Sequence, residues 1–551
     1  MMDNEFGNKI SAEYYSFLRK YTKTTYQDTK LLGKYYTDFS VADDIVNTID
    51  LQIINKNDYA DIKIIDPFCG DGRLVLLLLK KMVNSGKILQ WSKILITLWE
   101  IDSNALKIAE KSILEYCQAN SINYEINLRN CDAFVEYRNF ESQYDICITN
   151  PPWCLLKPQK TIDSCDVKIY RNILEQYDMY IKEILPMSQP SSKFGKWGTN
   201  LARCGIEVAL RLINEKGICG IVSPASLFND QVSVKLRKWI FNKFNILKLC
   251  YYPAELKLYG KADIASVTAI FKRGLQNKRI PIHTYDNFKK CTEEFLGTSE
   301  LKFIQNHNYA IPLKTGIDSI EVMIKLERLP SVKDYCERVG LSFTRELDET
   351  RIKEKLTSNG NFKFVKGYMV DRYIFKDDNL YLNEELVSIP TTANLYKLVW
   401  RDVSRDSQVR RIKAMILPPG YVCGNSLGVI VGSKEQLPYM KTLLAVMNSI
   451  IFEYQARSML VSNHVSVGII KKIKLPSFTI NYKLVDLVNC QLKGENEKQE
   501  IELLVTKLYG VSVEEYKRVL RIFKFSKDEI ASLLERYIEI KKNNKEINYD
   551  K

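Results

Sequence analysis

Between about residues 60 and 275, short runs of β-branched and apolar residues alternate with amphipathic segments. The apolar runs occupy 62–66, 94–100, 126–130, 144–150, 217–223, 246–252 and 266–273, and the amphipathic segments include 102–116 and 201–214. Strands and helices that alternate at this spacing are typical of βαβ units in a doubly wound parallel sheet. The sequence therefore predicts a Rossmann-like α/β domain whose ligand lies beyond the carboxyl ends of the strands.

The rest of the chain does not follow this alternation of strands and helices. With 551 residues the chain is longer than one hydrophobic core accommodates, so two domains are expected. A polar stretch over 155–200 interrupts the alternation and is interpreted as a long loop or insertion beside the site. Past about residue 290 the spacing becomes irregular and lysine-rich, and the tail from about 485 is charged and helical in pattern. This half is expected to be a mixed α+β domain with a helical tail.

Charge and cysteine usage narrow the class of protein. The balance of 80 Lys+Arg against 66 Asp+Glu, a net charge of +14, favours a polyanionic partner, although surplus surface lysine would give the same value. The 13 cysteines include no Cys-x-x-Cys pair and there are only three histidines, so no metal is expected. The polar N-terminus and unpaired cysteines favour a cytoplasmic protein, and the longest apolar run (74–79) is too short for a membrane span.

A glycine-containing loop follows the first predicted strand. It reads Asp66-Pro67-Phe68-Cys69-Gly70-Asp71-Gly72 and precedes the apolar run. Glycines at these two positions let the backbone turn tightly and approach a ligand, although a structural tight turn is the alternative interpretation. The pattern is neither the dinucleotide fingerprint nor a P-loop, which disfavours NAD and ATP.

Acidic residues stand at the ends of the next two predicted strands. Glu100 is placed to accept both hydroxyls of a ribose, and Asp132 is placed to accept the amino group of an adenine ring. Asp102 is a better candidate than Glu100 for the N-cap of the following helix. Together with Asp66, three acids at three successive strand ends predict a crevice suited to a nucleoside.

The fourth predicted strand ends in Asn150-Pro151-Pro152-Trp153. An exocyclic amine is a poor nucleophile because its lone pair is delocalised into the ring. Hydrogen bonds from its two N–H groups to two acceptors push the nitrogen towards a nucleophilic geometry. The Asn150 side-chain oxygen and the Pro151 carbonyl are the candidate acceptors, the prolines fix the turn, and Trp153 offers a face for a flat base. A proline turn that merely closes the strand is the competing interpretation.

With these motifs in place, the sequence resembles the amino-methyltransferases whose signature is Asn/Asp-Pro-Pro-aromatic. Within them it is similar to the N6-adenine DNA methyltransferases of restriction–modification systems in the gamma arrangement, where a target-recognition domain comes last. Gly33-Lys34-Tyr35-Tyr36-Thr37 matches the leading motif of that family. The resemblance is strongest between 33 and 273, and it departs at Trp153, where Tyr or Phe is commoner, and at Arg73, where an apolar residue is common.

This resemblance implies S-adenosyl-L-methionine as cofactor and double-stranded DNA as substrate, with the adenine flipped out of the helix. It implies a catalytic domain over 1–285, a target-recognition domain over 286–551, a monomer on DNA, a prokaryotic cytoplasmic location, and a cognate restriction endonuclease as a partner. The implied catalytic residues are Asn150, Pro151, Pro152, Trp153 and Tyr259; the implied cofactor-binding residues are Tyr36, Thr37, Asp66, Phe68, Gly70, Gly72, Glu100, Ile101, Asp132, Ala133 and Asn150. The candidate DNA-binding residues are Lys366, Trp400, Arg401, Arg405, Arg410 and Arg411.

Three other functions stay open at this point. RNA-adenine and protein-glutamine methyltransferases carry the same tetrapeptide, although the glutamine enzyme needs no long basic C-terminal half. A methyltransferase fused to or partnered with an endonuclease is a second alternative. A non-catalytic DNA-binding specificity protein that retains a vestigial cofactor fold is the third.

Overall fold

The computed structural model divides into two compact units, Met1–Ile317 and Asp318–Lys551. The residues it describes are 4–21, 32–53, 61–90, 93–158, 166–190, 198–259, 263–274, 277–286, 291–314, 316–405, 408–460, 463–477, 479–523 and 525–546. The first unit extends past residue 285, because a strand and a helix beyond that position pack with it. Each unit is described separately below.

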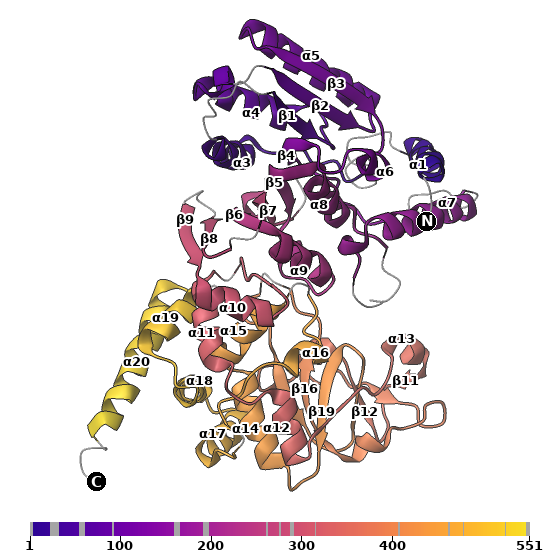
Figure 1. The fold of residues 1–551 in the computed structure, drawn as a ribbon. Helices are drawn as coiled ribbons and strands as arrows, with labels where there is room; N and C mark the ends of the chain where they lie inside the picture. The colour runs from indigo at the N-terminus through magenta and orange to yellow at the C-terminus, as the bar shows by residue number, and fades with distance from the viewer. Residues whose placement is uncertain are drawn as a thin grey trace. The chain divides into compact units, whose positions relative to one another are not determined.

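The first unit is built on one nine-stranded sheet with the order β3-β2-β1-β4-β5-β7-β6-β8-β9 (Figure 1). Neighbouring strands from β3 to β5 are parallel, whereas β7 runs antiparallel to both of its neighbours. The strands are β1 (Ile62–Asp66), β2 (Ile94–Glu100), β3 (Tyr124–Asn130), β4 (Tyr144–Thr149), β5 (Ile213–Pro224), β6 (Phe244–Tyr252), β7 (Ser266–Arg273), β8 (Ile280–Tyr285) and β9 (Cys291–Leu296). The prediction of a doubly wound, mainly parallel sheet is confirmed.

Helices cover both faces of this sheet (Figure 1). On one face α3, α4 and α5 bury their apolar stripes in a shared core, and α8 and α9 pack on the other. The helices of the unit are α1 (Asn4–Arg19), α3 (Phe39–Gln52), α4 (Arg73–Asn84), α5 (Ser103–Ala119), α6 (Ala133–Glu136), α7 (Val167–Ile184), α8 (Leu201–Leu212), α9 (Val234–Lys243) and α10 (Thr298–Asn306). The helix predicted over 201–214 ends two residues early, because Ile213 already belongs to β5.

The interpretation of 155–200 as a long loop is wrong in its centre. Residues 167–184 form α7, which packs on α1. Its buried positions recur at helical spacing and are Tyr170, Leu174, Tyr177, Tyr180 and Ile181. Three of the buried side chains on this face are tyrosines, which weakens the apolar pattern in the sequence. Residues 159–165 and 191–197 of the same stretch lie outside the described residues.

The second unit combines small sheets with a helical layer, as the mixed α+β prediction requires. Its larger sheets have the orders β10-β19-β16-β17 and β11-β15-β12-β18. The longer strands are β16 (Tyr396–Arg401), β17 (Ala414–Leu417) and β19 (Leu427–Gly432); the short ones are β10 (Ser342–Thr344), β11 (Leu356–Thr357), β12 (Lys363–Val365), β13 (Val370–Asp371), β14 (Ile374–Phe375), β15 (Tyr381–Leu382) and β18 (Tyr421–Cys423).

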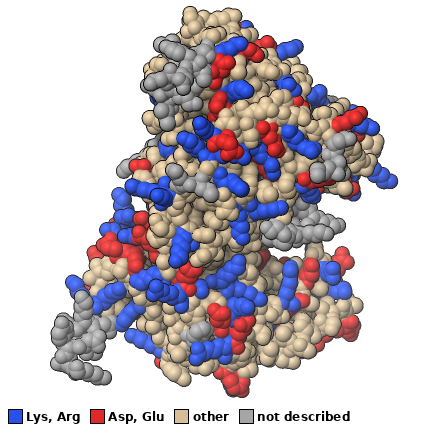
Figure 2. Space-filling model, in the orientation of Figure 1, with Lys and Arg blue, Asp and Glu red and all other residues tan. Residues whose placement is uncertain are grey.

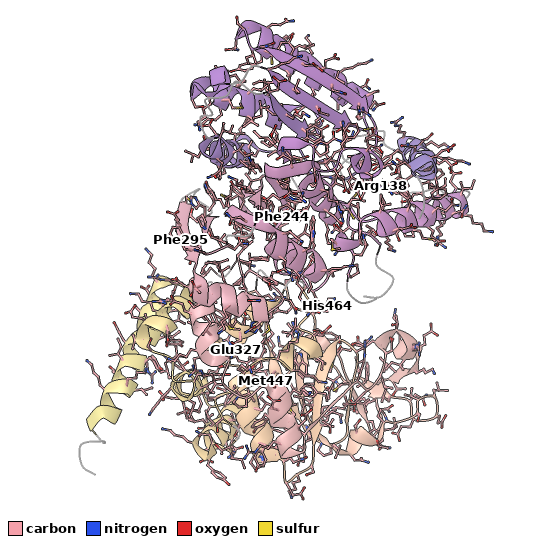
Figure 3. All side chains as sticks on the ribbon, in the orientation of Figure 1. Arg138, Phe244, Phe295, Glu327, Met447 and His464 are labelled. Carbon is pink, nitrogen blue, oxygen red and sulfur yellow. The ribbon has the colours of Figure 1, made fainter. Side chains whose placement is uncertain are left out.

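The helices of the second unit pack against the sheet β10-β19-β16-β17 and against one another. They are α11 (Asp318–Leu326), α12 (Val332–Val339), α13 (Glu349–Ile352), α14 (Leu437–Met447), α15 (Ile450–Met459), α16 (Val467–Ile470), α17 (Tyr482–Leu492), α18 (Lys498–Leu508), α19 (Val513–Arg521) and α20 (Lys527–Glu546). Their largest buried cluster contains Met447, labelled in Figure 3, and Trp400 from β16. Within the described part of the chain, no helix combines the length and apolarity that a bilayer span needs.

Candidate functional site

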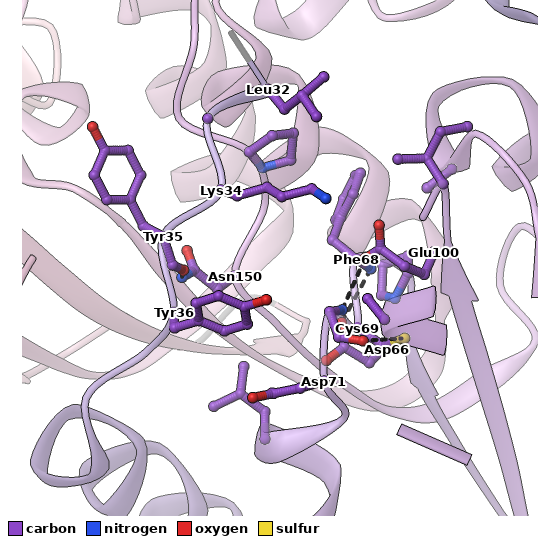
Figure 4. Close-up of a pocket in the computed structure, with 18 of the residues that line it drawn as sticks. Leu32, Lys34, Tyr35, Tyr36, Asp66, Phe68, Cys69, Asp71, Glu100 and Asn150 are labelled. Atoms are coloured by element: carbon purple, nitrogen blue, oxygen red, sulfur yellow. Dashed lines mark hydrogen bonds between the residues drawn. The ribbon is translucent and has the colours of Figure 1, made fainter. Parts of the chain in front are cut away.

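A pocket lies beyond the carboxyl ends of β1, β2, β3 and β4, as predicted for a sheet of this type (Figure 4). It encloses about 930 Å³ not occupied by atoms, part of it open to solvent. Ten of the predicted cofactor-binding residues line it: Tyr36, Thr37, Asp66, Phe68, Gly70, Glu100, Ile101, Asp132, Ala133 and Asn150. Residues from strand ends far apart in the sequence therefore share one cavity of a size suited to a nucleoside.

The glycine loop after β1 makes the tight turn that the sequence predicted. Gly70 and Gly72 have φ angles of 52° and 76°, which favour glycine. Gly70 lines the pocket, whereas Gly72 is the N-cap of α4 and packs against α5, since an added Cβ would lie 2.8 Å from the Cβ of Ala109. Gly72 therefore serves helix packing, while Gly70 serves the cavity.

Asp66 is buried at the end of β1, where it holds the loop. Its Oδ1 accepts hydrogen bonds from Thr149 Oγ1 at 2.6 Å and from the backbone N–H of Phe68 at 3.1 Å. Desolvation raises the pKa of this carboxyl to about 7. The bond from Thr149 joins β4 to β1, and the bond from Phe68 holds the glycine loop to the same carboxylate, so Asp66 connects that loop to the strand that precedes Asn150.

Glu100 connects the glycine loop to the start of α5. Its Oε2 accepts from Gly70 N at 2.8 Å and its Oε1 accepts from Asp102 N at 3.0 Å. Each oxygen keeps a second lone pair, which is what a ribose diol requires. Asp102 is the N-cap of α5, as predicted, and it also forms an ion pair with Lys34 at 2.7 Å. Burial raises the pKa of Glu100, and the Lys34 ammonium opposes that rise.

Asp132 has partners that the sequence did not reveal. Its Oδ2 accepts from Ser11 Oγ and from Tyr177 Oη, each at 2.7 Å, and its Oδ1 accepts from Phe134 N at 3.0 Å. Ser11 lies on α1 and Tyr177 on α7, so these two helices fix the carboxylate. Tyr15 of α1 also lines the pocket. Oδ2 already accepts two hydrogen bonds, whereas Oδ1 accepts one. Oδ1 is therefore the oxygen with a lone pair left to accept a hydrogen bond from a ligand.

The segment 33–37 links the pocket to the Asn150 motif. Gly33 has a φ of 67°, and its carbonyl accepts a hydrogen bond from Trp153 N at 3.0 Å. A Cβ at Gly33 would lie 2.6 Å from Trp153 N, so the two backbones touch. At the other end of the segment, the Arg73 guanidinium donates to the Thr37 carbonyl at 2.8 Å. Arg73, whose contact the sequence left undefined, thus holds this segment.

The side-chain nitrogen of Asn150 is hydrogen-bonded, whereas its side-chain oxygen has no partner among the described residues. Its Nδ2 donates to the Tyr35 carbonyl at 2.8 Å and to Thr37 Oγ1 at 3.2 Å. A backbone carbonyl only accepts, so the amide nitrogen must face Tyr35 and the Oδ1 must face the other way. Among the described residues, this buried Oδ1 has no hydrogen-bond partner. Asn150 also lines the pocket, so an unused acceptor stands at its edge.

Three aromatic rings gather beside Asn150. The Trp153 and Tyr259 ring centroids are 4.6 Å apart in an edge contact, and Tyr35 lies 5.2 Å from Trp153 and 5.8 Å from Tyr259. The structure thus brings together the two aromatic residues predicted to hold a base. A further ring cannot stack between Trp153 and Tyr259 while they touch, so a flat ligand here would lie on an outer face or part the two rings.

Two of the residues predicted to bind DNA, Trp400 and Arg411, are core residues of the second unit, and the assignment is wrong for them; a third, Arg410, has its guanidinium paired with a buried carboxylate. Trp400 is 0% exposed and donates from its Nε1 to the Val465 carbonyl. Arg410 pairs with the buried Glu453 at 2.8 Å, and Arg411 is 2% exposed. A cluster of arginines looks alike in the sequence whether it neutralises phosphates or buried carboxylates.

The other candidates for DNA binding keep some exposure. Arg401 is half-buried and donates to the carbonyls of Gly367, Tyr368 and Val370. Lys366 is half-buried, and Arg405 is exposed. On the face that Figure 2 shows, basic and acidic side chains are interspersed. The DNA-binding roles of these three residues stay predictions.

The sheet order places one antiparallel strand, β7, between β5 and β6. Residues 73–259 match the family model described as Eco57I restriction-modification methylase. This match shows a likeness of residues 73–259 to a restriction-modification methylase, and S-adenosylmethionine is the cofactor that the likeness implies. The acids and the open lone pairs around the pocket fit that cofactor.

The chain is also similar in part to individual proteins. The type II methyltransferase M.VspI from Vibrio sp. (strain 343) is 26% identical over 132 residues, which are 24% of this chain and 28% of that protein. The chain thus matches little more than a quarter of this curated relative. The type IIL restriction-modification enzyme MmeI, solved in complex with DNA, has a TM-score of 0.54 at 12% identity and covers 96% of this chain and 82% of its own. The DrdV–DNA complex has a TM-score of 0.51 at 11% identity, with 88% and 59% covered.

Proposed function

We propose that the protein transfers a methyl group from S-adenosylmethionine to N6 of adenine in double-stranded DNA, as the modification activity of a restriction–modification system. The observation that carries the proposal is the buried, unpartnered Asn150 Oδ1 beside the pocket. An acceptor of this kind is suited to a donor N–H of the substrate, because leaving it unpaired costs free energy.

The reaction needs an activated amine more than it needs a base. Asn150 Oδ1 accepts one N–H of the adenine amino group and the Pro151 carbonyl accepts the other, which localises the nitrogen lone pair. The bound cofactor supplies an electrophilic methyl group: N6 forms the new C–N bond as the C–S bond breaks. The resulting ammonium is acidic and loses its proton to water. Asn150 is held for this role by Tyr35 and Thr37.

The duplex must release its base to reach this position. A paired adenine presents its amino group inside the helix, so the base has to be extruded before its N6 reaches a pocket edge. Trp153 and Tyr259 receive it by stacking once their present edge contact opens. A duplex-binding second unit and a cognate endonuclease complete the proposal, supported by the net charge of +14 of the whole chain and by the restriction-modification family that residues 73–259 match.

The experiment offers tritiated S-adenosylmethionine with duplex DNA of mixed sequence, RNA and a protein mixture side by side. Enzymatic digestion followed by mass spectrometry identifies the methylated product. We expect N6-methyladenine in duplex DNA alone. Label in RNA or in glutamine side chains assigns the chain to another amino-methyltransferase. Cofactor binding by calorimetry without transfer to any of the three overturns the proposal in favour of a non-catalytic role.

A further inference from the structure

Outside the pocket, metal-binding side chains converge between α3 and strands β6, β8 and β9. The carboxylate of Asp44, the thiol of Cys250 and a ring nitrogen of His283 all lie within 4.8 Å of one another. The Sγ of Cys291 lies 3.5 Å from His283 Nδ1. In the described residues, none of these four lines the pocket of the methylase site.

The sheet register explains why these side chains meet. Cys250 and His283 are register partners on the parallel strands β6 and β8, so both side chains point to the same face. Tyr285, two residues after His283, shares that face, and its register partner on β9 is Cys291. Helix α3 brings Asp44 to this face, where it bonds to Tyr252 and Tyr285.

The donor set has the chemistry that Zn²⁺ prefers. Two thiolates, an imidazole and a carboxylate are all zinc ligands, and four such donors close a tetrahedral structural site. Bonds of about 2.0–2.3 Å place tetrahedral ligand atoms roughly 3.3–3.8 Å apart. The 3.5 Å between Cys291 Sγ and His283 Nδ1 lies in that range. The Asp44, Cys250 and His283 donors lie within 4.8 Å of one another, and Cys291 meets this set through His283, so the proposed site requires the side chains to rotate inwards when the metal binds.

Neighbouring groups orient two of the donors. Both tyrosines donate to Asp44 Oδ2, Tyr285 at 2.7 Å, which leaves Oδ1 directed elsewhere. Glu293 Oε1 lies 3.4 Å from His283 Nε2, and this contact turns Nδ1 towards Cys291. A carboxylate on the outer nitrogen of a ligand histidine is a recurring arrangement at zinc sites.

We propose that Asp44, Cys250, His283 and Cys291 bind one Zn²⁺ that fastens α3 to the edge of the central sheet. The absence of a Cys-x-x-Cys pair led the sequence analysis to expect no metal, but these ligands come from four separate elements. Helix α3 follows directly on the segment that carries Tyr36 and Thr37. The zinc therefore stabilises the helix that anchors one wall of the methylase pocket.

Lys248 is the group that competes with the metal. Its Nζ lies 3.3 Å from Asp44 Oδ1, the oxygen that the zinc requires. In the metal-free protein this ammonium balances the carboxylate, and zinc binding displaces it towards solvent. Replacing Lys248 by methionine keeps the length of the side chain and removes the competing charge, so Lys248→Met is expected to bind zinc more tightly.

The test uses the full chain, stripped of metal with a chelator and kept reduced. Titration with Co²⁺ is expected to reach one ion per chain and to give thiolate-to-cobalt charge-transfer absorption. Zn²⁺ is then titrated against a chromophoric chelator. Cys291→Ser and His283→Ala should weaken zinc at least about tenfold, and Glu293→Ala should weaken it about tenfold. Cys490→Ser, a partly exposed cysteine of the second unit, serves as the matched control and should not change the affinity.

Several results would overturn the site. Binding below one cobalt per chain, absorption without a thiolate band, or equal zinc affinity in Cys291→Ser and the control each rules it out. An unchanged or weaker affinity in Lys248→Met contradicts the assigned competition. Metal-free melting curves of each variant separate loss of a ligand from misfolding. A disulfide between Cys250 and Cys291 in the protein purified without reductant would replace the zinc site by a redox pair.

Discussion

Replacing Asn150 by alanine removes both the nitrogen and the oxygen of its amide, and the two losses affect different measurements. The variant loses the hydrogen bonds from Nδ2 to the Tyr35 carbonyl and to Thr37 Oγ1. At about 1 kcal/mol each, they account for roughly 2 kcal/mol of stability. It also loses the unpartnered Oδ1, which the proposed reaction uses to activate the amine. Removing one preorganised partner of a reacting group lowers kcat by about 100- to 1000-fold. We therefore expect a modest loss of stability and a large loss of methyl transfer.

Single-turnover transfer of labelled methyl to duplex DNA measures the chemical step, and calorimetry measures cofactor affinity on the same preparation. Cofactor affinity is expected to change by less than about threefold, since Asn150 contributes one edge of a large pocket. Asn120→Ala, an exposed asparagine bonded only to its own helix through the Tyr116 carbonyl, is the matched control. Transfer within tenfold of the wild type, in a variant that binds cofactor, would refute the activating role of the amide oxygen.

Three other substitutions test separate parts of the structure. Gly33→Ala forces a side chain onto a backbone with φ of 67° and should lower the free energy of unfolding by about 1–2 kcal/mol or more, with reduced transfer, measured by denaturant titration. Folding raises the pKa of Asp66 to about 7, so the contribution of this group to the free energy of unfolding is full at low pH and declines as the pH rises towards 7. Asp66→Asn should flatten that decline. Unfolding curves taken from about pH 4 to about pH 8 measure it. Arg410→Ala removes an ion-pair partner of the buried Glu453 and should lower the free energy of unfolding by about 3 kcal/mol, without altering the salt dependence of DNA binding. Arg405→Ala should instead lower the slope of log affinity against log salt concentration by about one and leave the melting temperature unchanged.

The central sheet could be predicted from the sequence because its strands are continuous apolar runs. The observed bounds of β1, β2 and β7 coincide with the predicted runs, and the acids at the strand ends share one pocket. This success has a physical reason: the carboxyl ends of parallel strands meet at one edge, so a residue's position in its strand fixes its place in space. Lys34 belonged to a recognised motif, yet its ion pair with Asp102 was not foreseen.

The failures involve contacts that depend on tertiary structure. Tyr177 and Ser11 reach Asp132 from α7 and α1, and tyrosines that pack by their rings while donating through their hydroxyls leave a weak pattern in the sequence. Trp400, Arg410 and Arg411 stand in a basic, aromatic segment that suggests a DNA surface, but buried Glu453 neutralises part of it. The partner carboxylate lies 43 residues from Arg410 in the chain and cannot be paired with it by spacing alone.

The short connection through residues 33–37 makes the pocket and the amine-activating group thermodynamically linked. The same backbone lines the cavity at Tyr36 and Thr37, holds the Asn150 amide, and bonds to Trp153. A ligand that orders this segment also positions the Asn150 amide, so the entropy cost of ordering it is not incurred again when the proposed substrate base binds. By reciprocity, the proposed substrate, DNA with an accessible adenine, is expected to raise the affinity for the cofactor by the same factor. The ratio of affinities with and without the other ligand, measured for either ligand, gives the coupling free energy that residues 33–37 transmit.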